Sequence, residues 1–160
     1  MRRPRKARAA AKKNKKSVQP GYARAIGQAA GEMALLENRL GEAMAALLGI
    51  EAKLGRIIYL SSHTAFGRVA TLDVIASSVL PHGSATLEHL RGLTKRAREV
   101  LTHHHNSAHE VWDASSDAKK RTIHARKLGD QSRTVKKLAS EVADATKSLH
   151  GAGRKRARKG

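Results

Sequence analysis

The apolar residues between Tyr22 and Leu48 recur every three or four positions. They are Ile26, Ala29, Met33, Leu36, Leu40, Met44 and Leu47. An α-helix turns about 100° per residue, so this spacing draws one apolar stripe along one side of a helix. A half-buried strand would instead alternate apolar and polar residues. The sequence therefore predicts a long amphipathic helix whose stripe must be buried against other elements.

Two further segments carry helical patterns. Residues 64–80 have apolar side chains on nearly all sides, and Arg68 and Asp73 are their only charged residues. We expect this helix to be buried over most of its surface. Ser84 is the expected N-cap of a long third helix that ends near Trp112. The stripe of this third helix consists of Leu87, Leu90, Leu93, Ala97, Leu101, Ala108 and Trp112.

The rest of the chain is less regular. Residues 113–131 show no apolar stripe and are predicted as a polar, basic connection, partly extended at residues 122–124. The short apolar run at residues 57–60 is compatible with either helix or strand. A last helix is expected from residues 132–134 onward, with one apolar face made by Val135, Leu138, Val142, Ala145 and Leu149. Several amphipathic helices predict an all-α fold, a four- to five-helix up-and-down bundle.

Basic residues gather at the two ends of the chain. Residues 1–19 hold nine Lys or Arg and no acid, and residues 151–160 hold five more, so the ends supply +14 of the formal net charge of +19. Their few apolar side chains cannot offset the entropy of ordering. We expect two disordered tails around one domain at residues 20–150. The tail bases are Arg2, Arg3, Arg5, Lys6, Arg8, Lys12, Lys13, Lys15, Lys16, Arg154, Lys155, Arg156, Arg158 and Lys159.

Lys and Arg on a flexible segment neutralise phosphates without reading base sequence. We therefore expect all the tail bases to bind nucleic acid. Alternative roles are solubility or adhesion to acidic lipids or proteins. In a eukaryote, residues 12–16 would also serve as a nuclear import signal.

Several classes of protein lack support in this sequence. No apolar segment of signal-peptide or membrane-spanning length follows the basic start, so we expect a cytoplasmic protein without a membrane partner. There is no cysteine, hence no disulfide framework or thiolate chemistry. Glycine-rich phosphate loops, GxSxG elbows and HExxH helices are also missing, and no cofactor is expected.

The third helix carries the densest chemical signal. At about 100° per residue, Arg91, Arg98, His105 and His109 share one 40° band beside the apolar stripe. Histidine transfers protons near neutral pH and arginine holds phosphate, which suffices for metal-independent RNA cleavage by the 2′-hydroxyl. We expect Arg91 and His105 to contact nucleic acid. The alternative is a solvated basic flank.

The same histidines raise the question of a metal ion. His105 and His109 are spaced i, i+4, which supplies two ligands, but zinc normally takes three or four. No metal site is predicted.

Two short segments suggest a family. They are Glu37-Asn38-Arg39-Leu40 in the first helix and Lys95-Arg96-Ala97-Arg98 … Asn106-Ser107-Ala108-His109-Glu110-Val111-Trp112 in the third. With a middle helix between them, this arrangement resembles HEPN-type domains. It looks most like small bacterial members in which Arg-Asn-x-x-x-His precedes a bulky apolar or aromatic residue. The resemblance spans residues 26–149 and is specific only around residues 95–112.

The resemblance implies a helical bundle that dimerises, with Arg and His of both copies lining a cleft that cuts RNA. His109 takes the place of the family histidine. His104 and His105 stand where the family has arginine and asparagine, and a histidine grips phosphate only when protonated. A second register pairs Arg98 with residues 103–105. The catalytic candidates are therefore His109, His104 and Arg98, and a toxin-type member would add a protein antitoxin as a partner.

Three further residues need an explanation. Asp73 projects into an apolar band, where an unpaired carboxylate is costly, so we expect a base or a backbone N–H beside it. Glu37 poses the same question on the first helix. Trp112 is expected to be a core or dimer-interface anchor, because four aromatic residues in the whole chain cannot build a stacking ladder.

Two functions follow from these observations. The first is a HEPN-like RNA-associated protein, either a ribonuclease of the toxin or defence kind or a relative that does not cleave. The second is a non-enzymatic nucleic-acid-binding or scaffolding bundle that acts through its tails. We expect a homodimer, paired partly through the third helix, with RNA favoured as the ligand.

Deleting residues 1–19 and 151–160 tests the role of the tails. Binding of RNA or DNA should weaken strongly, because most of the charge is removed, while the thermal midpoint should change little. Titrations of labelled nucleic acid at several salt concentrations measure this effect. A truncated chain with unchanged affinity and salt slope would show that the tails do not carry the binding.

Overall fold

The structure is a computed structural model that describes the backbone of residues 20–114 and 117–157, and the side chains of residues 20–104 and 117–150. Within these ranges it contains five helices and no strand, which confirms the all-α prediction. The helices are α2 (Pro20–Leu48), α3 (Ala52–Leu60), α4 (Ala65–Val79), α5 (Ala85–Ala114) and α6 (Ala118–Ala157). The predicted N-terminal tail, residues 1–19, lies outside the described residues.

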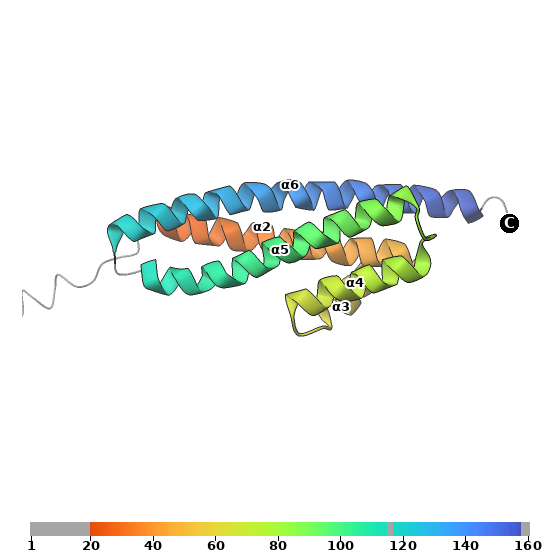
Figure 1. The fold of residues 1–160 in the computed structure, drawn as a ribbon, viewed down its shortest axis with the longest axis horizontal. Coiled ribbons are helices and arrows are strands. Elements are labelled where there is room, and N and C mark those ends of the chain that lie inside the picture. The colour runs from red at the N-terminus through yellow and green to blue at the C-terminus, as the bar shows by residue number, and fades with distance from the viewer. Residues whose placement is uncertain (1–19, 115–116, 158–160) are drawn as a thin grey trace, which may run out of the picture.

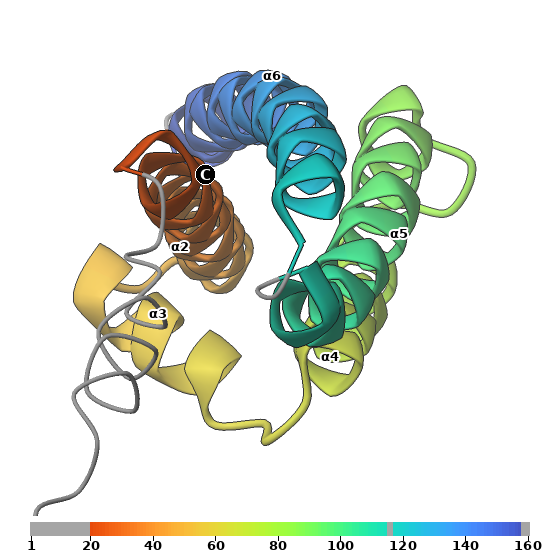
Figure 2. The same ribbon diagram turned by 90° about the vertical axis from the view of Figure 1, so that its left-hand side faces the viewer.

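Three long helices form an elongated bundle. Figure 1 shows α2, α5 and α6 side by side along the long axis, with the chain direction alternating from one to the next. The helix α2 packs against α6, α3 and α4, while α5 packs against α4 and α6. Figure 2 looks along the bundle and shows α3 and α4 on the side away from α6. The two short helices thus form an extra layer over one side of the three long ones.

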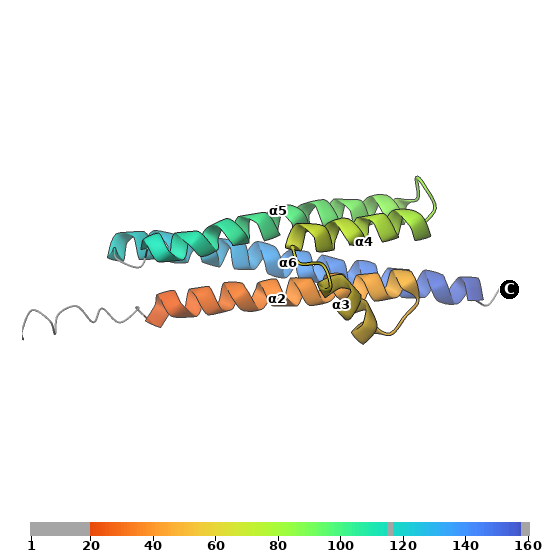
Figure 3. The same ribbon diagram turned by 90° about the horizontal axis from the view of Figure 1, so that it is seen from below.

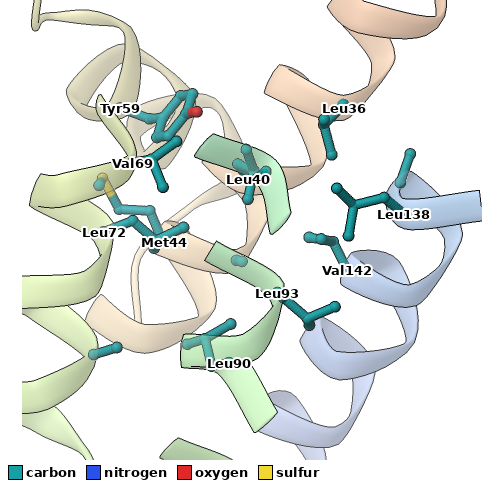
Figure 4. Packing of buried hydrophobic residues seen from close by; sticks show 14 of the residues in the cluster. Leu36, Leu40, Met44, Tyr59, Val69, Leu72, Leu90, Leu93, Leu138 and Val142 are labelled. Atoms are coloured by element: carbon teal, nitrogen blue, oxygen red, sulfur yellow. The ribbon is translucent and has the colours of Figure 1, made fainter. Parts of the chain in front are cut away.

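The core lies where α2, α4, α5 and α6 meet. Leu36, Leu40 and Met44 of α2 point toward side chains from the three other helices (Figure 4). Their partners include Val69 and Leu72 from α4, Leu90 and Leu93 from α5, and Leu138 and Val142 from α6. These residues belong to the apolar stripes of the sequence, so the predicted core faces of α2, of α5 as far as Leu101 and of the second half of α6 are confirmed.

The prediction of a connection at residues 113–131 is wrong. The helix α5 continues to Ala114 and α6 begins at Ala118, so residues 122–124 are helical. The buried positions in this stretch do follow helical spacing, at Arg121, His124, Leu128 and Ser132. Three of these four residues are polar, and a search for apolar periodicity therefore misses the stripe.

The expected extent of burial of α4 is also wrong. Val69, Leu72 and Ala76 are its buried residues, whereas Phe66 and Val74 are 58% and 64% exposed. The reason is the position of α4 in the outer layer, where α2, α3 and α5 cover one side of the helix and leave the other side open.

Two boundaries became clear in the structure. Residues 57–60 belong to α3, a helix that the sequence left undecided. At the other end, α6 continues past the expected domain limit at His150 to Ala157, so residues 151–157 extend the last helix rather than starting a tail. Residues 158–160 lie outside the described residues.

The acids within apolar bands have partners. Glu37 of α2 forms an ion pair with Arg68 of α4, and both side chains are largely buried. Burial, followed by the nearby Glu37 carboxylate, raises the pKa of Tyr59 far above its usual range, so this phenol stays neutral. Asp73 accepts a hydrogen bond from the Thr94 hydroxyl at 3.4 Å, where the sequence favoured a base or a backbone N–H.

Close approach of α3 to α2 depends on Gly55. A Cβ at this position would lie 2.7 Å from the Cα of Ala45 on α2. Gly55→Ala should therefore lower the free energy of unfolding by about 1–3 kcal/mol, because backbone must move to admit the methyl group. Urea unfolding followed by circular dichroism measures this loss.

Gly92→Ala is the matched control, because nothing lies within 4 Å of a Cβ at this helical position. It should raise the free energy of unfolding by up to about 1 kcal/mol, since alanine restricts the unfolded chain. Equal stability of the two variants would contradict the close packing of α3 on α2.

Candidate nucleic-acid interface

The net charge of the domain is concentrated on its last helix. Residues 20–116 contain nine bases and nine acids and are neutral overall. Residues 117–150 contain nine bases and four acids, so they carry the whole +5 of the domain. Eight of these bases and two of the acids lie at residues 117–137, in the first half of α6. Residues 113–131, expected to be a connection, supply five of these eight bases.

The geometry of α6 sorts these bases onto one side. Lys119, Arg126, Arg133 and Lys137 are exposed and fall within one 40° band at about 100° per residue. This band, called the α6 stripe below, lies opposite the buried residues Leu128 and Val135. At about 1.5 Å per residue the α6 stripe is about 27 Å long. Lys120, Lys127 and Lys136 are exposed at its flanks.

Two acids accompany the α6 stripe, and each has a local partner. Asp130 forms an ion pair with Arg133 one turn further along α6. The carboxylate of Asp117 accepts hydrogen bonds from the backbone N–H groups of Lys119 and Lys120, at 2.8 and 3.4 Å. These two backbone hydrogen bonds are the main reason why the pKa of Asp117 is lowered. Asp117 therefore acts as the N-cap of α6 and fixes where the basic helix begins.

A buried polar contact attaches the start of α6 to the start of α2. The Tyr22 hydroxyl and Nδ1 of His124 are 2.8 Å apart, and both residues are buried. Their rings meet edge to face, with centroids 5.8 Å apart. Leu128 and Ala29 complete a small apolar cluster around Tyr22. This contact holds the basic half of α6 against α2.

The same end of the bundle gathers several parts of the chain. Figure 3 shows the start of α2, the end of α5 and the start of α6 at one end of the long axis. The basic segment at residues 1–19 joins the described structure at Pro20, at the end of the bundle where α6 begins. The side chains of residues 1–19 lie outside the described residues, but their point of attachment is defined.

Of the predicted band on the third helix, Arg91 and Arg98 lie among the described side chains. Arg91 contacts Glu88 at 3.0 Å and donates to the Ser77 hydroxyl of α4 at 3.2 Å. Arg98 stacks on the Phe66 ring of α4, 4.5 Å from its centroid. These two arginines thus contact α4. Arg91 nevertheless remains exposed, so its expected contact with nucleic acid stays a prediction.

His104 lies on a different side of α5. It lines a groove of about 300 Å³ between α2, α5 and α6, together with Met33, His103 and Asp130. Because six residues separate Arg98 from His104, their directions differ by about 120° around the helix. The structure therefore does not bring these two catalytic candidates together within one chain. His105 and His109 lie outside the described side chains, as does Trp112.

The remaining predicted contacts fall at the ends of the chain. Arg154, Lys155 and Arg156 lie on the last turns of α6, with side chains outside the described set. Arg158 and Lys159 lie outside the described residues altogether. The α6 stripe was missed in the sequence, although spacings of seven, seven and four between its bases are a helical signal. The signal was overlooked because the segment was interpreted as non-helical.

Neither a membrane span nor a metal cluster is found in the described part of the chain. None of the described helices has the length and apolar content needed to cross a bilayer. No group of three or more His, Asp or Glu side chains there is placed to hold a metal ion. Comparisons with protein-family models, curated proteins and solved structures found no match to this chain.

Replacing Asp117 with alanine tests the start of α6. The Asp117→Ala variant should have a slightly lower thermal midpoint at neutral pH, because the N-cap hydrogen bonds are lost. The folded-state pKa of Asp117 is lowered, so its stabilisation is present above the unfolded pKa of about 3.9 and fades as the pH falls through the folded value. The difference between the variant and the wild type should therefore shrink in acid.

Asp117→Asn is the control, because asparagine also caps helices but carries no titrating carboxylate. It should keep most of the stability at neutral pH. Thermal melts of the three proteins across acidic and neutral pH measure both effects. An Asp117→Ala deficit that is constant with pH would contradict the role of the carboxylate.

Proposed function

We propose that this protein binds nucleic acid without base specificity, through phosphate contacts made by the α6 stripe and by residues 1–19. The observation that carries the proposal is the uneven distribution of charge in the domain. Residues 20–116 are neutral overall, and the whole net charge of the domain lies along α6. Lysine and arginine in a row neutralise successive phosphates and release counterions. The nine bases of residues 1–19, attached at the same end, extend this surface.

The side chains of α6 favour a helical duplex over single strands. The helix contains no Phe, Tyr or Trp, so it offers no platform on which unpaired bases stack. Tyr22 and Tyr59 are buried in the domain, and Phe66 lies on α4 beneath Arg98. A straight row of cations about 27 Å long suits a regular phosphate backbone. RNA is the favoured ligand because the sequence resembles HEPN-type domains, which act on RNA.

RNA cleavage stays a prediction of that resemblance and is not part of the proposal. Its chemistry needs a base and a phosphate-gripping cation in one cleft. Arg98 is stacked on Phe66, and His104 faces the groove beside Asp130. Incubation with mixed RNA in chelator, with His109→Ala as the comparison, distinguishes a cleaving protein from one that only binds.

Neutralising the α6 stripe tests the proposal. The triple variant Lys119→Gln, Arg126→Gln and Lys137→Gln keeps good helix formers and removes three charges. Each lost phosphate contact reduces the slope of log affinity against log salt by about 0.9 for duplex DNA, so the slope should fall by up to about 2.7. Affinity at low salt should fall at least about tenfold. Fluorescence anisotropy of a labelled duplex at several salt concentrations measures both quantities.

A second triple variant serves as the matched control. Lys53→Gln, Lys95→Gln and Lys147→Gln remove the same charge from exposed positions on α3, on α5 and beyond the basic half of α6. This control should leave the salt slope nearly unchanged. If both triple variants reduce the slope equally, net charge alone governs binding and the α6 stripe is not the interface.

A further inference from the structure

The outer layer of the domain exposes large apolar side chains. Val74 and Phe66 on α4 are 64% and 58% exposed, and Ile57 on α3 is 56% exposed. Leu54, Ile58 and Leu60 of α3 and Val79 of α4 are exposed as well. Single exposed apolar residues are ordinary, but seven on two adjacent helices form a surface that soluble monomers rarely leave in contact with water. We call these seven residues the α3/α4 face.

The outer side of α4 is also free of charge, whereas α3 adds an exposed Lys53 one turn before Ile57. The charged residues of α4, Arg68 and Asp73, contact Glu37 of α2 and Thr94 of α5. The outer side of α4 exposes Thr71, Val74 and Ser78, spaced three and four residues apart. A surface helix without an outward charge is unusual in a chain that is 28% charged. Depletion of charge is what distinguishes the centre of a protein interface from ordinary surface.

The α3/α4 face lies away from the basic side of the molecule. The helices α3 and α4 pack against α2 and α5, and Figure 2 shows them across the bundle from α6. The face belongs to residues 20–116, which carry no net charge, whereas the α6 stripe belongs to the charged remainder. A partner on the α3/α4 face therefore meets a neutral surface.

We propose that the α3/α4 face binds the α3/α4 face of a second copy of this chain. Two chains of formal charge +19 repel each other unless they meet on neutral surface and keep their cations apart. A back-to-back pair through α3 and α4 meets both conditions, because it leaves the two α6 stripes on opposite outer sides. A twofold pair also uses one self-complementary patch, and the outer side of α4 has no like charges to oppose. The small exposed residues Thr71 and Ser78 allow the two α4 helices to approach closely around Val74.

Other occupants fit less well. A helix that lies on a membrane surface carries its Lys and Arg beside its apolar face, whereas Arg68, the one base of α4, forms an ion pair with Glu37 of α2. Residues 1–19 hold nine bases and no acid, so they offer little apolar surface to cover the face. The pairing also differs from the one expected through the third helix, because Arg91 and Arg98 of that helix already contact α4.

The substitution Val74→Lys tests the proposal. Val74 is highly exposed in the monomer, so the variant should fold with unchanged circular dichroism, but in the pair it would bury two like charges near the axis. Sedimentation velocity of the full chain, without nucleic acid, should show a dimer for the wild type. The dimer dissociation constant of Val74→Lys should be raised at least about tenfold. The control Ile123→Lys changes an apolar residue of α6 that is 52% exposed, and it should remain a dimer.

A second measurement uses the absence of cysteine from the chain. Single cysteines placed by Thr71→Cys, Val74→Cys or Ser78→Cys lie on the outer side of α4, and at least one should form a disulfide-linked dimer under mild oxidation. Ile123→Cys is the matched control and should stay unlinked. A monomeric wild type, a dimer unaffected by Val74→Lys, or crosslinking at position 123 but not on α4 would each overturn the proposal. A monomer that instead co-sediments with lipid vesicles would assign the α3/α4 face to a membrane.

Discussion

Packing of α2 against α6 is the contact on which the rest of the structure depends. These two helices share the most extensive interface of the domain and run side by side along the bundle (Figures 1 and 3). Leu36 and Leu40 pack with Leu138 and Val142 in its middle, while Tyr22 bonds to His124 at its end. Because the inner side of α6 is committed to α2 and α5, its bases are directed to the opposite side. The basic surface is therefore a consequence of the core.

The separation of neutral and basic parts gives the molecule two unlike sides. One side is the α6 stripe, which is suited to phosphate. The other is the α3/α4 face, which is suited to apolar contact. If both proposals hold, a dimer presents two cationic helices on opposite outer sides and can bridge two nucleic-acid segments. This arrangement increases avidity by linking two weak, non-specific contacts in one particle.

The neighbours of the third helix explain why Arg91, Arg98 and His104 do not converge within one chain. On an isolated helix, Arg91, Arg98, His105 and His109 would form one continuous band. In the folded protein, α4 covers the part of this band that holds the two arginines. Arg91 bonds to Ser77 and Arg98 stacks on Phe66, so both guanidinium groups have contacts within the domain. His104, 120° away around the helix, faces α2 and α6 instead. The family resemblance rests on residues around His109, whose side chain lies outside the described set.

The sequence by itself determined the helical class, the stripes of α2 and α5, and the uneven charge, because periodicity and composition are local properties. It predicted Leu36, Leu40, Leu90 and Leu93 as core residues, and they are buried. The first half of α6 was not predicted as a helix, since its buried side includes the polar residues Arg121 and His124, and Tyr22, the partner of His124, comes from a distant part of the chain. Only the tertiary structure decided which sides are covered. Which sides of a helix are covered depends on contacts between residues far apart in sequence. Neighbouring helices cover only one side of α4, so Val74 is exposed, and they cover the inner side of α6, so its bases face outward.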